Sequence, residues 1–215
     1  MPVSTDGVLL GSWAKLEASK NLLDIGTGTG LLSLMCAQRN ASLTIDAIEI
    51  DSNALQAAQS NFAQSPWSDR IQLHSGDVLT RPFHGKFDTI ICNPPYFNSG
   101  EQTQNISRAT ARHTNSLSHE DLLQCCWDLL TDQGYASFVL PKVEGDAFID
   151  LAKQQGWSLQ RLCQVRPTEY KEVSRLLIQL GKQSTSAVLT TLTIHDNGGY
   201  SSDFIRLTKA FYLKM

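Results

Sequence analysis

An apolar strand that runs directly into three closely spaced glycines is the feature that most restricts how this chain can fold. The segment reads Leu22-Leu23-Asp24-Ile25-Gly26-Thr27-Gly28-Thr29-Gly30, and a helix-like stretch follows at about 29–39. Glycines permit a sharp turn and a close approach of a ligand to the main chain. The first turn of a helix offers free N–H groups to an anion or a carboxylate. A unit of this kind is typical of sheets whose parallel strands are joined by helical crossovers.

The remainder of the chain continues this alternation of strand-like and helix-like segments. We expect strands at 21–25, 43–50, 70–74, 87–92, 134–140, 158–166, 173–181 and 187–194, and helices at 7–17, 29–39, 52–64, 119–131, 144–155 and 202–212. Asp6, Asp51 and Ser118 are the expected N-caps, with Asp121 at the third helical position after Ser118. The last strands follow one another without a helix, which predicts an antiparallel edge. The pattern indicates one α/β domain covering residues 1–215.

Composition narrows the setting in which such a domain works. The chain has 41% hydrophobic and 18% charged residues, as in ordinary globular proteins, and no apolar run long enough to span a membrane. Five cysteines without a C-x-x-C pair indicate a reducing, cytoplasmic environment. The histidines lack metal-ligand spacing, so we expect no metal. A net charge of −3 counts mildly against a nucleic-acid binder, although a local patch can still bind phosphates.

Acidic residues follow the second and third expected strands at positions that suit a nucleoside. Glu49 ends the second strand, where a carboxylate can accept hydrogen bonds from both ribose hydroxyls. Asp77 follows the third strand and could accept from an adenine amino group, with Val78 packing on the ring. A dinucleotide fingerprint would place its third glycine where this chain has Leu31. These features therefore favour S-adenosylmethionine over NAD, with simple structural turns as the alternative.

The tetrapeptide Asn93-Pro94-Pro95-Tyr96 follows the fourth expected strand and precedes a long polar stretch, 97–117. Consecutive prolines cannot donate to a ladder, but they give a stiff backbone with free carbonyls. An amide oxygen and a proline carbonyl can accept both hydrogens of a planar NH2 group, while an aromatic ring stacks on the group that carries it. The motif fits an enzyme that modifies an exocyclic or amide nitrogen, and its alternative is a rigid turn.

Taken together, the glycine turn, Glu49, Gly76-Asp77 and Asn93-Pro94-Pro95-Tyr96 resemble the class I S-adenosylmethionine-dependent methyltransferases. Three narrower segments are similar to the bacterial valine-tRNA adenine-N6 methyltransferases: Thr5-Asp6-Gly7-Val8-Leu9-Leu10-Gly11, Gln64-Ser65-Pro66-Trp67 and Leu207-Thr208-Lys209-Ala210-Phe211-Tyr212-Leu213. The likeness covers essentially the whole chain. One departure is that family members carry a longer basic and aromatic segment before the Thr-Asp-Gly motif, whereas here Met1 lies almost on top of it.

This resemblance implies a Rossmann-like fold with a seven-stranded, mostly parallel sheet, an antiparallel C-terminal edge and helices on both faces. It implies methyl transfer from S-adenosylmethionine to N6 of the adenine 3′ of the anticodon of a valine tRNA, by a cytoplasmic monomer that binds tRNA transiently. The cofactor would contact Asp24, Gly26, Gly28, Gly30, Glu49, Asp77, Val78 and Asn93. The catalytic residues would be Asn93, Pro94 and Tyr96, and the substrate would contact Pro95, Phe97, Arg108 and Arg112, with His113 nearby.

Several alternatives stay open at this point. The same motif serves enzymes that methylate a glutamine amide in release factors or guanine N2 in ribosomal RNA. A catalytically silent S-adenosylmethionine- or RNA-binding module is the non-enzymatic alternative, and a nicotinamide oxidoreductase is disfavoured by Leu31. A second basic cluster, Arg161, Arg166, Lys171 and Arg175, fits a surface stripe on an edge strand better than an RNA contact.

Overall fold

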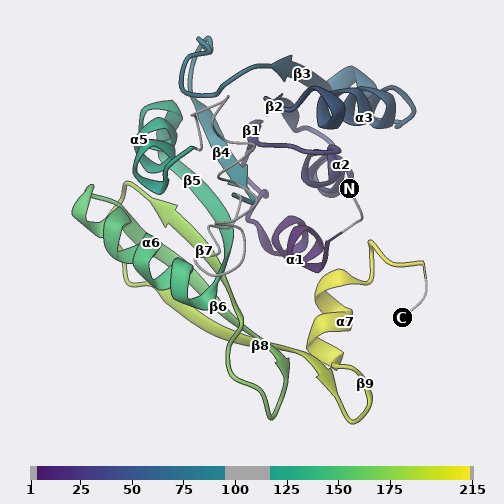
Figure 1. Ribbon diagram of the computed structural model, residues 1–215, viewed down its shortest axis with the longest axis vertical. Helices are drawn as coiled ribbons and strands as arrows, with labels where there is room; N and C mark the ends of the chain where they lie inside the picture. Colours follow the sequence, from purple (N-terminus) through teal and green to yellow (C-terminus); the bar gives the residue numbers. More distant parts are fainter. Residues whose placement is uncertain (1–3, 95–116, 214–215) are drawn as a thin grey trace, which may run out of the picture.

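One twisted sheet runs through the protein and carries helices on both faces (Figure 1). The computed structural model describes residues 4–94 and 117–213. Within these residues the sheet has nine strands in the order β3-β2-β1-β4-β5-β7-β6-β8-β9. The strands are β1 (Asn21–Ile25), β2 (Thr44–Glu49), β3 (Ile71–Ser75), β4 (Phe87–Cys92), β5 (Leu130–Pro141), β6 (Ser158–Thr168), β7 (Arg175–Gly181), β8 (Val188–Asp196) and β9 (Gly199–Tyr200).

The expected fold class is confirmed, with two differences in the sheet. Strands β3, β2, β1, β4 and β5 are all parallel, as helical crossovers require. Strand β7 is antiparallel to β5 and β6, as predicted for the C-terminal part. The seven strands that the family resemblance implied were too few: the strand expected at 187–194 is β8, and the short strand β9 was not expected. In addition, β8 runs parallel to β6, since two successive reversals of the chain return it to the direction of β6.

The helices divide between the two faces of the sheet as Figure 1 shows. One face carries α1 (Thr5–Trp13), α2 (Leu31–Arg39), α3 (Ser52–Ala63) and α7 (Ser202–Thr208), and the other carries α5 (His119–Leu129) and α6 (Lys142–Gln154). A short 3₁₀ turn, Ser68–Arg70, precedes β3. Within the described ranges, no helix is long and apolar enough to cross a membrane.

The two faces of the sheet carry separate hydrophobic clusters, because successive residues of each central strand point to opposite faces. In β1, Leu22 joins the core beneath α1, α2 and α7, whereas Leu23 joins the core beneath α5 and α6. Both leucines are fully buried. A strand covered on both faces reads as a continuous apolar run, and the sequences of β1 and β4 are mostly apolar for this reason.

The Thr-Asp-Gly segment forms the buried helix α1, and its glycines allow close packing against α2. A Cβ at Gly7 would lie 3.0 Å from Leu31, and one at Gly11 would lie 2.7 Å from the Met35 sulfur. The predicted N-cap Asp6 was wrong: Ser4 Oγ accepts from Gly7 N at 3.0 Å. Asp6 lies in the first turn instead, where its carboxylate pairs with Arg175 at 2.9 Å.

Candidate active site at the carboxyl edge of the sheet

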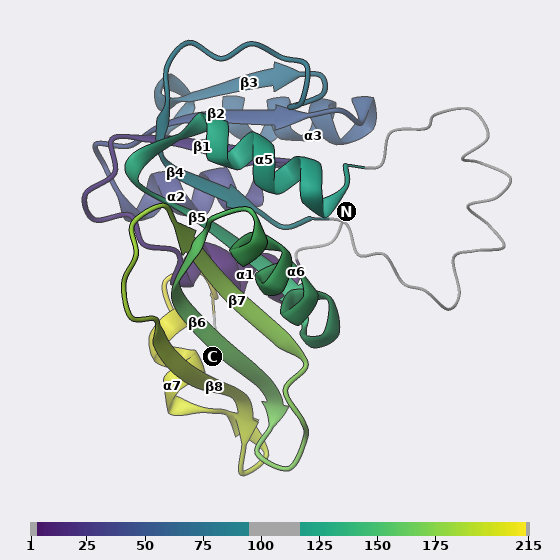
Figure 2. The same ribbon diagram turned by 90° about the vertical axis from the view of Figure 1, so that its left-hand side faces the viewer.

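The glycine turn and the Asn93-Pro94 corner lie next to each other at the carboxyl edge of the sheet. The register of β1 and β4 pairs Ile25 with Cys92, so Gly26 and Asn93 are the next residues of two neighbouring strands. Adjacent strands are roughly 4.8 Å apart, so the two motifs flank the same point on the carboxyl edge of the sheet. In Figure 2 the arrowheads of β2, β3 and β4 point to this edge, which the structure describes up to Pro94.

The glycine turn has a backbone that other residues rarely adopt. Gly26, Gly28 and Gly30 have φ angles of +66°, +60° and +88°, in the left-handed region that favours glycine. A Cβ at Gly30 would also lie 2.3 Å from the ring of Phe62 on α3. The N–H groups of Gly26 and Thr27 both donate to the Ile48 carbonyl, which ties the turn to the neighbouring strand.

Asp24 is a completely buried carboxyl group under this turn. Its Oδ2 accepts from Thr27 Oγ1 and Ser33 Oγ, each at 2.6 Å, and from Ser33 N at 3.1 Å. Its Oδ1 is also buried and has no hydrogen-bond partner within the described ranges. Burial raises the pKa of Asp24 from 3.8 to about 6, against the hydrogen bonds from Ser33 and Thr27, which lower it. A buried carboxylate with an unpaired oxygen is a potential acceptor for a cationic ligand group.

Glu49 closes the turn from the second strand with its side chain. Oε2 accepts from Gly28 N at 2.8 Å, and Oε1 accepts from Ile50 N and Asp51 N at 2.9 Å each. A carboxylate has about four acceptor positions, so backbone groups occupy most of them, and the residue is only 8% exposed. Bidentate binding of a ribose therefore requires that Glu49 exchange the bond from Gly28 for one from a ligand hydroxyl.

Asp77 and Val78 form a turn directly after β3. Asp77 Oδ1 accepts from Leu79 N at 2.9 Å, and the Asp77 carbonyl accepts from Thr80 N and Arg81 N. Asp77 therefore forms the structural turn that was the alternative to an adenine contact. These turn bonds use Oδ1 and the carbonyl of Asp77 and do not involve Oδ2. Val78 is 7% exposed and belongs to the core beneath α5, so only its edge is available to a base.

A partly buried chain of polar groups holds this turn against the sheet, and the sequence analysis missed it. Arg81 Nη2 lies 2.7 Å from Nδ1 of His74, whose Nε2 lies 2.5 Å from Asp46 Oδ1. Because a guanidinium can only donate, His74 accepts at Nδ1 and donates from Nε2 to Asp46. The residues come from β2, β3 and the following turn, and no local motif links them in the sequence.

The NPPY corner is described only for its first two residues. Asn93 is partly exposed and Pro94 is buried. Outside the described residues lie the other predicted substrate contacts and their neighbours: Pro95, Tyr96, Phe97, Arg108, Arg112 and His113.

The second basic cluster, which is formed by Arg161, Arg166, Lys171 and Arg175, was expected to form a stripe on an edge strand. This expectation was wrong, because β6 lies between β7 and β8 and is not an edge strand.

Two members of that cluster have structural partners. Arg161 lies 4.2 Å over the Trp13 ring and donates to Gln179 Oε1 at 3.1 Å. Arg175 pairs with Asp6. These two arginines therefore have intramolecular partners that account for them without RNA.

Ile50 is a candidate contact that the sequence analysis did not select. Its side chain is 65% exposed between two acidic residues, Glu49 and Asp51. A large apolar side chain at the exposed end of a strand next to the ribose-binding candidate is suited to pack on a base. In the sequence, Ile50 could have been recognised as an apolar residue between two acidic residues at the end of a strand.

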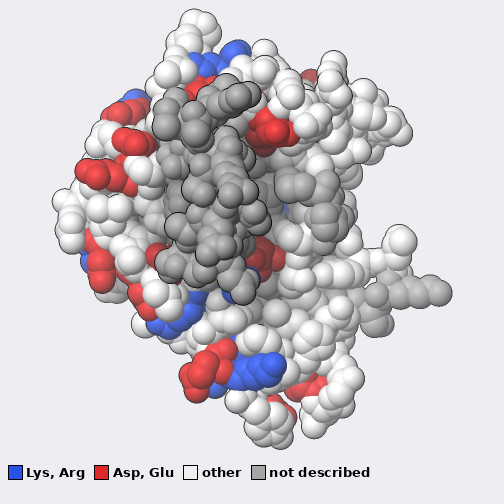
Figure 3. Space-filling model, in the orientation of Figure 1, with Lys and Arg blue, Asp and Glu red and all other residues white. Residues whose placement is uncertain are grey.

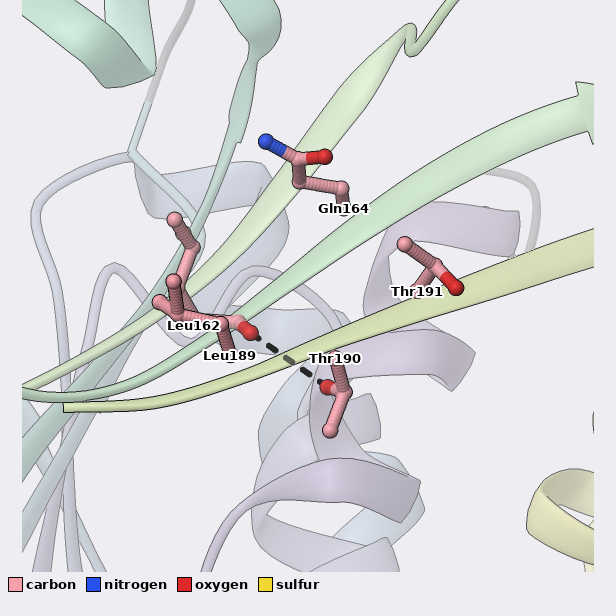
Figure 4. Close-up of a pocket in the computed structure, with 5 residues that line it drawn as sticks. All are labelled: Leu162, Gln164, Leu189, Thr190 and Thr191. Carbon is pink, nitrogen blue, oxygen red and sulfur yellow. Dashed lines mark hydrogen bonds between the residues drawn. The ribbon is translucent and has the colours of Figure 1, made fainter.

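Of two cavities on the described surface that we compare, one lies near this edge. A cavity of about 370 Å³ lies between the turn after β3 and α5, lined by Val78, Leu79, Arg81, Asp121, Gln124, Cys125, Asp128 and Leu129. The other, of about 260 Å³, lies on β6 and β8 (Figure 4). Strands β5 and β7 separate it from β4. Among the described residues, no group of three or more His, Cys, Asp or Glu side chains could hold a metal ion.

The fold and this edge together define a methyltransferase. The family model described as Methyltransferase small domain matches residues 6–121. A solved structure described as a predicted O-methyltransferase, Atu636 from Agrobacterium tumefaciens, has a TM-score of 0.71 at 19% identity and covers 95% of this chain and 96% of its own. The glycopeptide N-methyltransferase MtfA, solved with S-adenosyl-L-methionine, has a TM-score of 0.62 at 13% identity, with 85% and 100% covered. At these identities the likeness concerns the fold.

Sequence relatives define the family more narrowly. A protein of Vibrio vulnificus (strain YJ016) named tRNA1(Val) (adenine(37)-N6)-methyltransferase is 59% identical over 215 residues, which is 100% of this chain and 90% of the relative. A protein of the same name from Aliivibrio salmonicida (strain LFI1238) is 54% identical over 216 residues, covering 100% and 92%. The chain belongs to the tRNA1(Val) (adenine(37)-N6)-methyltransferase family, as the sequence resemblance predicted.

Proposed function

We propose that this protein transfers a methyl group from S-adenosylmethionine to the exocyclic N6 of an adenine in tRNA, at the position 3′ of the anticodon of a valine tRNA. The observation that carries the proposal is the register of β1 and β4, which places the Asn93-Pro94 corner beside the glycine turn. The family membership supports the same reaction and substrate. We treat residues 1–215 as one catalytic domain that acts as a monomer in the bacterial cytoplasm, where its tRNA substrate is found.

The residues of the glycine turn fit this cofactor. Its methionine part carries a cationic amino group and a sulfonium, and Asp24 offers a buried carboxylate oxygen without a partner beneath the turn. The left-handed glycines leave the main chain open to close approach. Glu49 supplies acceptors for the ribose hydroxyls, and Asp77 with Val78 and Ile50 supplies an acceptor and apolar contacts for adenine. Bound S-adenosylmethionine brings an already activated methyl group, so the protein need not build a nucleophile.

The Asn93-Pro94 corner accounts for the choice of nitrogen. The Asn93 side-chain oxygen and the Pro94 carbonyl are both acceptors, and together they can bind the two hydrogens of an NH2 group. The lone pair of an adenine N6 is delocalised into the ring, and two such hydrogen bonds favour a tetrahedral nitrogen with its lone pair directed toward the glycine turn. The catalytic gain is therefore alignment and charge placement. Tyr96 and Phe97 are proposed to stack on the splayed base, with Pro95, Arg108 and Arg112 as further RNA contacts.

The direct test incubates the protein with labelled S-adenosylmethionine and bulk tRNA from a strain that lacks the modification, followed by nucleoside analysis. N6-methyladenosine in valine tRNA is the expected product. Label in release factor glutamine or in ribosomal guanine would instead support the rival substrates. Cofactor binding without any turnover would support the silent module.

Substitution of Asn93 tests the role of the corner. Asn93→Ala is expected to retain cofactor affinity and to lose roughly 100- to 1,000-fold in kcat, the usual effect of removing one preorganised hydrogen-bonding group. Asn93→Asp is the matched control, because it keeps an acceptor oxygen at the same place and should retain more activity than the alanine variant. Unchanged turnover in Asn93→Ala would refute the assigned role.

A further inference from the structure

Two hairpins project from the sheet beyond the candidate active site. One joins β6 to β7 through residues 169–174, and the other joins β8 to β9. The register pairs Thr168 with His195, so the two hairpins lie side by side, and His195 Nδ1 lies 3.3 Å from the Pro167 carbonyl. Strands β6 and β8 run in the same direction as β4, and both hairpins are therefore on the carboxyl edge of the sheet, at its far end (Figure 2).

Aromatic rings are exposed on both hairpins. Tyr170 is 90% exposed at the tip of the first hairpin. On the second, the exposed His195 ring stacks on Tyr200 at 4.8 Å, and Tyr200 stacks on Phe204 at 4.9 Å. Phe204 is fully buried, so the stack is anchored in the core and ends in a solvent-facing ring. An aromatic ring that is held rigidly with one face open is a ready stacking platform for a base.

The strand register shows how far these platforms lie from the substrate nitrogen. Cys92 on β4 pairs with Phe138 on β5, and Pro141 is three residues further along β5. Pro141 and Val165 both pair with Arg175 on β7, so they lie at the same level of the sheet. Thr168 is three residues beyond Val165 on β6. Six residues at about 3.3 Å give roughly 20 Å along the strands, and three strand spacings add roughly 14 Å across them. The resulting distance is about 25 Å. The platforms are thus within reach of nucleotides that flank the target base.

Charge on these hairpins favours stacking over a phosphate contact. Lys171 lies between Glu169 and Glu172, and all three are exposed. Figure 3 likewise shows basic and acidic atoms interspersed over this face of the described residues, without a broad basic patch. An exposed aromatic ring can stack on any base through its π-face. The arrangement suits unpaired nucleotides better than the backbone of a duplex, whose recognition depends on phosphate contacts.

We infer that the β6–β7 and β8–β9 hairpins form a second RNA contact, on which Tyr170 and the His195–Tyr200 stack hold unpaired nucleotides flanking the adenine to be methylated. This inference rests on the proposed function for its substrate. It assigns tRNA binding to a part of the fold distant from the chemistry. Substitutions there should change the affinity for tRNA and leave the affinity for the cofactor and the chemical step unchanged.

The test compares wild type, Tyr170→Ala, Tyr170→Phe and His195→Ala in two assays. Direct binding of valine tRNA transcript is expected to weaken about 5- to 30-fold in each alanine variant, with KM rising in parallel and kcat unchanged. Tyr170→Phe is the matched control, since it keeps the ring and should bind like wild type. Cofactor affinity, measured by calorimetry, should be equal in all four proteins.

The two assays separate this inference from the proposed function. Wild-type protein that binds tRNA but methylates no adenine would contradict the proposed function, while the binding ratio of Tyr170→Ala to wild type would still decide the hairpin contact. Equal tRNA affinity in wild type and both alanine variants, or no tRNA binding by wild type, would overturn the hairpin contact. A loss of kcat at unchanged tRNA affinity would also overturn it, because a stacking platform about 25 Å away cannot act on the chemical step alone.

Discussion

Asp24→Asn should change stability in a way that depends on pH with a sign opposite to that of most carboxylates. Burial raises the pKa of Asp24 from 3.8 to about 6, so the folded protein holds this proton more tightly than the unfolded chain. The folded state therefore loses stability as pH rises from about 4 to about 6, and the loss is complete above that window. A salt-bridged surface carboxylate shows the reverse behaviour.

The size of the effect follows from the two pKa values. The interval between 3.8 and about 6 corresponds to about 3 kcal/mol at 1.36 kcal/mol per pKa unit. Linkage gives a cost of about 1 kcal/mol at pH 4.5 and the full amount at pH 8. The asparagine of the variant does not ionise, so the free energy of unfolding of Asp24→Asn relative to wild type should increase by about 2 kcal/mol between these pH values. The amide N–H groups beside the former Oδ1 affect both measurements equally and cancel in the difference.

Urea unfolding of both proteins at pH 4.5 and pH 8, without cofactor, measures this difference. Asp51→Asn is the matched control, because Asp51 is an exposed N-cap that accepts from Ala54 N and asparagine caps equally well. Its stability relative to wild type should change little between the two pH values. The reasoning is refuted if the stability difference between Asp24→Asn and wild type is the same at both pH values.

Two further substitutions test the neighbouring groups. Gly30→Ala should destabilise the protein by about 2–4 kcal/mol in urea unfolding, because it combines a strained left-handed backbone with a Cβ 2.3 Å from Phe62. Gly85→Ala is the control for the backbone strain alone, because Gly85 has φ +100° and open space around its Cβ position. This variant should lower the free energy of unfolding by less than Gly30→Ala does. Glu49→Gln replaces one acceptor oxygen by an NH2 group facing backbone donors, and should lower both stability, by about 1–3 kcal/mol, and cofactor affinity measured by calorimetry. Equal losses in the two glycine variants, or unchanged cofactor affinity in Glu49→Gln, would contradict these assignments.

The fold was predictable wherever local patterns and burial agree. Strand β4 has the bounds 87–92 that its apolar run predicted, and Asp51 and Ser118 cap α3 and α5 as expected. The cap of α1 was not predictable in this way, because Asp6 and Ser4 are both good caps and the choice depends on Arg175, which is 169 residues away in the chain. The two-residue strand β9 is equally invisible, since it exists only by pairing with His195 and Asp196.

The candidate site shows the same division between local and long-range information. Its positions at strand ends were predictable, because parallel strands bring their carboxyl ends to one edge. The hydrogen bonds that Glu49 accepts from the turn, and the chain from Asp46 through His74 to Arg81, were not. Those contacts depend on the register between β1, β2 and β3. Register is a property of the assembled sheet, and a single strand does not encode it.

Unfavourable local features gather at this one edge of the sheet, and their coincidence is itself an argument for function. The three left-handed glycines each reduce the stability of the turn, Asp24 is buried with an unpaired oxygen, and Ile50 exposes a large apolar side chain. Elsewhere the central strands are packed with apolar residues on both faces. A ligand with a cationic group, hydroxyls and an aromatic base would relieve each of these costs at once. Features that lower stability are expected to gather where selection for ligand binding has acted, because the bound ligand compensates for them.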